Sequence, residues 1–201
     1  GQLVSSFKNI ENERMDVIIE QIAILYHHNK ISRDASIALL RREIDNILYD
    51  SMLARNTNFR WGDRTSIFNN FSVIKYIRRL FEKDGLSVLD RIKKEKPGIQ
   101  FMTHDVLQKS DILFEAIGSG LRIIEMVRNP IDLIYSMNLK GYGDDIGINP
   151  IYWELSIQTK SQDIPYYAIE WRNEYLKLNP IDRVILIVDQ LFNEVLKSKI
   201  K

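Results

Sequence analysis

The sequence predicts an α/β fold, in which helices flank a parallel sheet and the N-terminal half is rich in helix. Before Pro97, apolar residues recur at helical spacing, and glycine and proline are scarce. After Pro97, short apolar runs alternate with helical segments, as expected for strands buried on both faces of a parallel sheet. The length of 201 residues is that of one domain. We therefore expect a single domain over residues 1–201, with a helical portion at 1–96 and an α/β portion at 97–201.

The helical portion contains three apolar stripes, and each predicts a helix. Ser32 or Asp34 is a suitable N-cap for the second helix, and Asp84-Gly85 is a suitable end for the third. The stripes run through residues 17–26, 37–48 and 67–81.

The α/β portion is predicted to contain three strands and three helices. Asn129-Pro130 is a strong start signal, because asparagine caps a helix and proline suits its first position. Gly118-Ser119-Gly120 is expected to end the helix before it. The predicted strands are residues 99–103, 122–127 and 184–188, and the predicted helices are residues 106–117, 130–139 and 166–178.

Composition excludes several classes of function. Lys plus Arg number 28 against 27 Asp plus Glu, so the net charge of +1 disfavours a broad nucleic-acid-binding face. The absence of cysteine excludes disulfides, cysteine-ligated zinc and a thiol nucleophile. The longest strongly apolar runs have about five residues, against roughly twenty for a membrane span. We expect a cytoplasmic protein with no membrane segment and no nucleic-acid partner.

Polar residues follow two of the predicted strands. His104 follows residues 99–103 directly, and Arg128 follows residues 122–127. The carboxyl ends of parallel strands share one edge of a sheet, so a general base and a cation would face the same crevice. Arg128 also precedes a helix N-terminus, which favours anions, and Ser136 in that helix could add a hydroxyl donor. The pattern predicts an anion site beside a base.

Plainer interpretations of these residues stay open. His104 could be an ordinary loop residue, and Arg128 could pair with Asp132 on the following helix. His27 and His28 are adjacent, so they point to different helix faces and make a poor metal pair; no metal site is expected. The three tryptophans are expected in the core or at its rim, with stacking on a base as the alternative; they are Trp61, Trp153 and Trp171.

Residues 99–104 and 121–136 resemble the middle of a sulfotransferase that uses 3′-phosphoadenosine 5′-phosphosulfate (PAPS). In that family a strand is followed by Arg-Asn/Asp-Pro, with a serine eight residues after the arginine, and Arg128 and Ser136 have this spacing. The resemblance implies that they hold the 3′-phosphate of the cofactor and that His104 removes the proton of the acceptor. Residues 167–191 resemble a later segment of the family. The implied architecture is a P-loop-NTPase-like sulfotransferase fold.

The resemblance implies transfer of a sulfuryl group from PAPS to a hydroxyl or amine, leaving adenosine 3′,5′-bisphosphate (PAP). The acceptor would be a small molecule or a carbohydrate; its identity and the oligomeric state stay open. The sequence departs from the family, with no Ser-Gly-Thr-Thr phosphate loop, with Met102 in place of a lysine and with Val188 in place of a tyrosine. A domain incomplete at both ends is therefore expected.

Two other classes of function remain as alternatives. One is a non-catalytic or degenerate nucleotide-binding or scaffold domain of the same fold, which the missing phosphate loop favours. The other is a nucleoside or small-molecule kinase. It would need a Gly-x-x-x-x-Gly-Lys-Ser/Thr loop, and the sequence has none.

Overall fold

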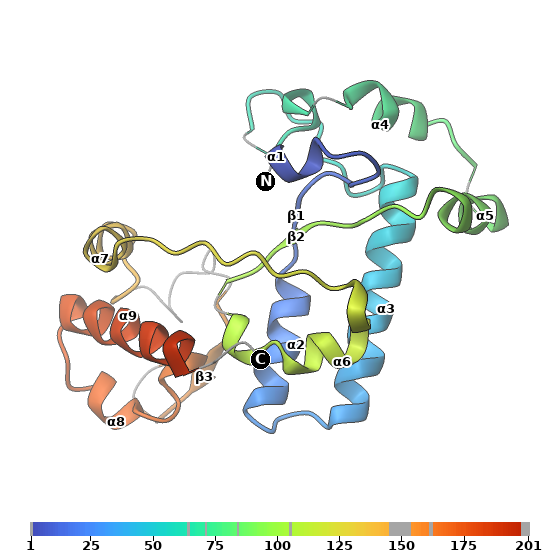
Figure 1. Cartoon of the computed structure of the whole chain (residues 1–201). Helices are drawn as coiled ribbons and strands as arrows, with labels where there is room; N and C mark the ends of the chain where they lie inside the picture. The colour runs from blue at the N-terminus through green and yellow to red at the C-terminus, as the bar shows by residue number, and fades with distance from the viewer. Residues whose placement is uncertain are drawn as a thin grey trace. The chain divides into compact units, whose positions relative to one another are not determined.

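The computed structural model of the chain describes residues 2–63, 65–70, 72–83, 85–104, 106–144, 154–160 and 163–197. The chain forms two compact units, drawn in Figure 1. Unit 1 comprises Gly1–His104 and Ile112–Gly118, and unit 2 comprises Asp105–Asp111 and Ser119–Lys201. Each unit is described by itself.

Unit 1 is mainly helical. Its elements are α1 (Gln2–Ser5), β1 (Arg14–Met15), α2 (Val17–His27), α3 (Arg33–Met52), the 3-10 helix η1 (Ile67–Asn69), α4 (Val73–Arg79), α5 (Leu86–Glu95), β2 (Phe101–Met102) and all but the first residue of α6 (Asp111–Ile117). Unit 2 contains η2 (Leu107–Lys109), α7 (Pro130–Leu139), β3 (Ser156–Gln158), β4 (Asp163–Pro165), η4 (Tyr166–Ala168), α8 (Arg172–Tyr175) and α9 (Pro180–Lys197). The short helix η3 (Gly118–Gly120) falls where the units meet along the chain.

Helices α2 and α3 confirm the first two apolar stripes, and they lie side by side (Figure 1). The Asp16 carboxylate accepts hydrogen bonds from the first backbone N–H groups of α2, and the Ser32 hydroxyl accepts one from Ala35 at 3.3 Å. Ser32 is thus the cap of α3, one of the two residues predicted for this role. Leu40 and Ile47 of the second stripe are buried, as predicted. The first stripe gives the wrong face of α2, because Ile18 is exposed while Ile19 and Ile24 are buried.

The third stripe does not form the predicted continuous helix. It is divided between η1 and α4, and α4 buries Tyr76 and Arg79 while Ile74 and Phe81 are exposed. The buried face is therefore set by polar contacts rather than by the apolar pattern. Asp84-Gly85 was predicted to end this helix. Gly85, with φ of +93°, precedes α5, and Asp84 lies outside the described residues.

The predicted parallel sheet is wrong. Within the described residues, β1 and β2 form a parallel pair only two residues long, and β3 pairs with β4 in an antiparallel hairpin. Only Phe101 and Met102 of the predicted strand 99–103 are in a strand, and residues 122–127 belong to none. Exposed side chains at Ile124 and Met126 show that the latter segment is not a buried strand.

The third predicted strand, residues 184–188, lies within helix α9. Val184, Ile187 and Val188 are buried while Ile185 is exposed, which is the spacing of one helix face. The Asn179 amide oxygen accepts a hydrogen bond from the Asp182 N–H at 3.0 Å, so an Asn-Pro pair starts this helix. Val188, at the position that the resemblance gives to an adenine contact, is a core residue of α9.

Helix α7 begins where Asn129-Pro130 predicted. The Asn129 amide oxygen accepts a hydrogen bond from the Ile131 N–H at 2.9 Å, and α7 packs against α9. Gly143, in the turn after α7, approaches the backbone of Pro180 so closely that a Cβ atom would collide with it. The carbonyl of Gly143 also accepts a hydrogen bond from Arg183 at 3.1 Å, which joins this turn to α9.

Two more predicted helices are found in broken form. Residues 106–117 contain η2 and α6, and Gly118, with φ of +76°, follows α6 as predicted. Residues 166–178 contain η4 and the one-turn helix α8 in place of one continuous helix.

Candidate functional site

His104 lies two residues after β2, in unit 1, and its partner is Glu20 of α2. Its backbone N–H donates to Glu20 Oε2 at 2.7 Å, and its Nδ1 lies 3.4 Å from the same oxygen. The imidazole is about half exposed, whereas the carboxylate is buried. A carboxylate at Nδ1 fixes the orientation of a histidine ring, which is the arrangement of a general base and its orienting group.

Glu20 is not among the site residues predicted from the sequence. Its neighbours Ile19, Ala23 and Ile24 are buried, so Glu20 belongs to the buried face of α2. A carboxylate on an otherwise apolar helix face is a signal for a buried polar contact, because an unpartnered charge there is costly. The sequence did not indicate which residue would be that contact.

Arg128 and Ser136 lie in unit 2, at the start of α7 and in its second turn. Arg128 is exposed and makes no hydrogen bond or ion pair with the residues that the structure describes. The Arg128–Asp132 ion pair, the plainer alternative, does not form, although both residues are described. The half-buried Ser136 hydroxyl likewise makes no hydrogen bond within the described part of the chain. Both groups retain their capacity to donate.

The two predicted phosphate-binding residues lie just before α7 and within it. Ser136 is seven residues beyond the cap Asn129, about two helical turns, so it falls on the face of α7 that carries the cap. Helical side chains lean toward the N-terminus, so the Ser136 side chain leans toward the end of α7 at which Arg128 lies, about 10 Å of helix axis away. His104 belongs to the other unit, unit 1.

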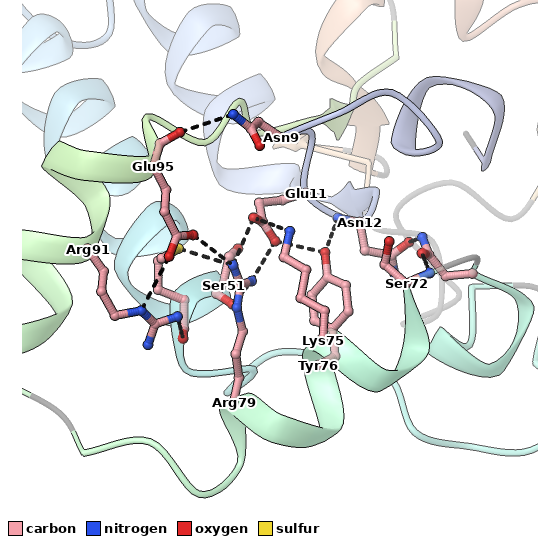
Figure 2. A network of polar contacts seen from close by, with 12 residues as sticks. Asn9, Glu11, Asn12, Ser51, Ser72, Lys75, Tyr76, Arg79, Arg91 and Glu95 are labelled. Atoms are coloured by element: carbon pink, nitrogen blue, oxygen red, sulfur yellow. Dashed lines mark hydrogen bonds and ion pairs between the residues drawn. The ribbon is translucent and has the colours of Figure 1, made fainter.

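A second charged cluster, which we call the Glu11 network, surrounds the buried Glu11 carboxylate in unit 1 (Figure 2). Arg79 donates to both carboxylate oxygens, at 2.6 and 3.1 Å. Lys75 lies 2.9 Å from Oε1, and the Tyr76 hydroxyl donates to Oε2 at 2.8 Å. The Tyr76 oxygen also accepts from the Asn12 N–H, so α4 is tied to the N-terminal segment. The charged groups of the Glu11 network thus pair with one another.

The ionisation of this cluster follows from its contacts. Burial raises the pKa of Glu11, but the hydrogen bonds from Arg79 and Lys75 outweigh burial, and the pKa lies below its ordinary value. Burial, followed by the negative charge of Glu11, raises the pKa of the Tyr76 hydroxyl. At neutral pH Glu11 is therefore charged and Tyr76 keeps its proton, as their hydrogen bonds require.

No protein family, curated protein or solved structure matches this chain. Among the described residues, no three His, Asp or Glu side chains form a group that could hold a metal ion. In the same part of the chain, no helix is both long enough and apolar enough to cross a membrane. The function is therefore inferred from the residues themselves.

Proposed function

We propose that the chain transfers a sulfuryl group from PAPS to a hydroxyl or amine, with Arg128 and Ser136 binding the nucleotide and His104 acting as general base. The observation that carries the proposal is Arg128, an exposed guanidinium at a helix start that forms no ion pair with Asp132. Its guanidinium is therefore available to an anion, and the start of α7 beside it favours one.

The 3′-phosphate of PAPS suits this end of α7. A guanidinium donates two parallel hydrogen bonds to phosphate oxygens, and the partial positive charge of the helix N-terminus adds to the attraction. The Ser136 hydroxyl supplies a third donor. Ribose and adenine would extend from this anchor.

His104 would accept the proton of the acceptor. With the Glu20 carboxylate 3.4 Å from Nδ1, a proton on Nδ1 would be favoured, and the neutral ring would then carry its lone pair on Nε2. As the acceptor oxygen or nitrogen bonds to sulfur, its proton passes to Nε2 and the sulfur–oxygen bond to the 5′-phosphate breaks. The products are the sulfated acceptor and PAP. Glu20 acts here as a positioning residue.

The nucleotide-binding half of the proposal is tested by calorimetric titration with PAP, with ATP as the competing ligand. We expect Arg128→Ala to weaken PAP binding by about 10- to 100-fold, because a charge-assisted contact of roughly 1.5–3 kcal/mol is lost. Arg172→Ala, which removes another exposed arginine of unit 2, should leave the affinity unchanged. Equal affinity in wild type and Arg128→Ala would contradict the assignment.

The catalytic half is tested by sulfation of 2-naphthol and of 2-naphthylamine with PAPS. His104→Ala should abolish turnover while PAP affinity is kept, and Glu20→Gln should lower turnover and displace its pH profile. Loss of PAP binding in His104→Ala would contradict the role of a base.

A second candidate is a nucleotide-binding domain without catalysis. The observation that favours it is that the predicted parallel sheet does not form in the described residues. Binding of PAP that depends on Arg128, without turnover of either acceptor by the wild type, would support this candidate over the enzyme.

A further inference from the structure

The loop between α3 and α4 displays an aromatic surface in unit 1. We call it the aromatic loop; its described residues are 57–63 and 65–70. Trp61 is 84% exposed although its ring packs at 5.3 Å, centre to centre, against the ring of Phe68. Phe59 contacts Phe68 from another side, at 6.3 Å. Tryptophan is usually well buried, so one held almost fully in water needs a reason.

Hydrogen bonds within the aromatic loop order the backbone on both sides of the exposed Trp61. Ile67 is fully buried, and its N–H donates to the Asn58 carbonyl at 2.8 Å. The Asn58 amide donates to the Thr65 hydroxyl at 2.9 Å, and the Asn69 amide donates to the Asp63 carbonyl at 2.9 Å. These bonds fix the loop on both sides of the indole, so a ligand would meet a surface that is already ordered.

Polar groups with unused capacity adjoin Trp61. The side chain of Arg60 is 85% exposed, and its Nε lies 3.9 Å from Asp63 Oδ2. The Nη groups of Arg60 and the Oδ1 atom of Asp63 have no hydrogen-bond partner among the described residues. An aromatic face is therefore accompanied by one donor group and one acceptor group of opposite charge.

We infer that the aromatic loop binds a neutral saccharide. The axial C–H groups of a pyranose carry a slight positive charge and pack on the electron-rich face of an indole. The hydroxyls at the edge of the ring both donate and accept hydrogen bonds, which matches Asp63 and Arg60. The indole would cover the apolar face of the sugar while the ion pair binds its rim.

The charges of the loop distinguish this ligand from a nucleic acid. A strand that stacks on aromatic residues also needs several cations along its phosphates. Among the described residues of the loop, Arg60 is the one cation, and its charge is balanced by Asp63. A membrane surface is disfavoured for a similar reason, because the described residues of the loop carry no excess of cations for anionic headgroups.

The inference is tested by calorimetric titration of the whole chain with cellohexaose and with β-1,4-galactotetraose, in the absence of PAPS. We expect millimolar or tighter binding of at least one of them, weakened tenfold or more by Trp61→Ala. Asp63→Asn should weaken it less, because a neutral acceptor remains. Thermal unfolding of each variant, followed by circular dichroism, verifies that the fold is kept.

Phe81→Ala is the matched control, since Phe81 is 85% exposed in the same unit and makes no ring contact among the described residues. Its affinity should equal that of the wild type. No binding of either saccharide, or equal binding by wild type and Trp61→Ala, would overturn the inference. Binding of an oligo-dT strand through Trp61 in place of the saccharides would also overturn it. PAP binding is measured independently, so failure here is distinct from failure of the proposed function.

Discussion

Two arginines of this chain have opposite surroundings. Arg79 is only 3% exposed and donates to both oxygens of Glu11 and to the Ser51 carbonyl, whereas Arg128 is exposed and bonds to none of the described residues. In the sequence, both are simply cations at the end of an apolar segment. The difference indicates that Arg79 stabilises unit 1 and that Arg128 is available to a ligand in unit 2.

The comparison is tested most severely by removing Arg79. Arg79→Leu should destabilise the chain by about 3–5 kcal/mol, because Glu11 would be left as a buried charge without its closest partner. The free energy of unfolding from urea titration measures this loss. The loss should appear as a lower midpoint for the unfolding of unit 1.

Two controls separate this effect from a general loss of positive charge. Arg78→Ala removes the exposed neighbour on α4, and Arg128→Ala removes the exposed arginine of unit 2. Each should change the free energy of unfolding by no more than about 0.5 kcal/mol, as surface substitutions usually do. A loss in Arg128→Ala comparable to that in Arg79→Leu would show that the contrast between the two arginines is mistaken.

Acid should weaken the Glu11 network by a smaller amount. The pKa of Glu11 is lower in the folded chain than its ordinary value of 4.5. The unfolded chain therefore binds the proton more readily, and the stabilisation present above pH 4.5 is lost as the pH falls through the folded pKa. Urea titrations between pH 7 and pH 3 measure this decline.

Glu11→Gln identifies the part of the decline that belongs to this residue. It keeps the side-chain shape and a hydrogen-bond acceptor but cannot titrate. The variant should be less stable at pH 7 and should lose less stability on acidification than the wild type. Parallel pH dependences in the two proteins would mean that other carboxylates account for the decline.

The smallest expected effect concerns the helix of unit 2 that was predicted as a strand. Asn179→Ala should cost about 1 kcal/mol, because the Asp182 N–H loses its cap acceptor. Asn129→Ala, at the matching cap of α7, should cost a similar amount. The two variants are compared by urea titration, and no loss in Asn179→Ala would count against the cap of α9.

The fold was predictable where local signals agree. The helical spacing in α2 and α3, the Ser32 cap and the Asn129-Pro130 start all act over a few residues, and the helices and starts that they predict are confirmed. Residues 184–188 misled because a continuous apolar run fits a buried strand and a buried helix equally well. The Asn179-Pro180 pair indicates a helix, because it is the same Asn-Pro start signal that correctly predicted α7.

Long-range polar contacts explain the remaining differences. α4 turns Tyr76 and Arg79 inward because both donate hydrogen bonds to Glu11, which lies 65 and 68 positions earlier in the chain. The spacing of apolar residues within α4 contains no information about this partner. The partnership of His104 with Glu20 spans 84 positions. The candidate residues His104, Arg128 and Ser136 were predicted from residue type and spacing. Glu20 could be identified only from its contact with His104 in the folded chain.

The close approach of Gly143 to Pro180 has a consequence for sequence divergence. Any side chain at position 143 would have to displace the first turn of α9. We therefore expect homologues that keep this turn to keep glycine at this position. Gly120 has nothing within 4 Å of where its Cβ would stand, and it should vary freely. A homologue that keeps glycine at the position of Gly143 is therefore expected to keep this turn, whatever residue it has at the position of Gly120.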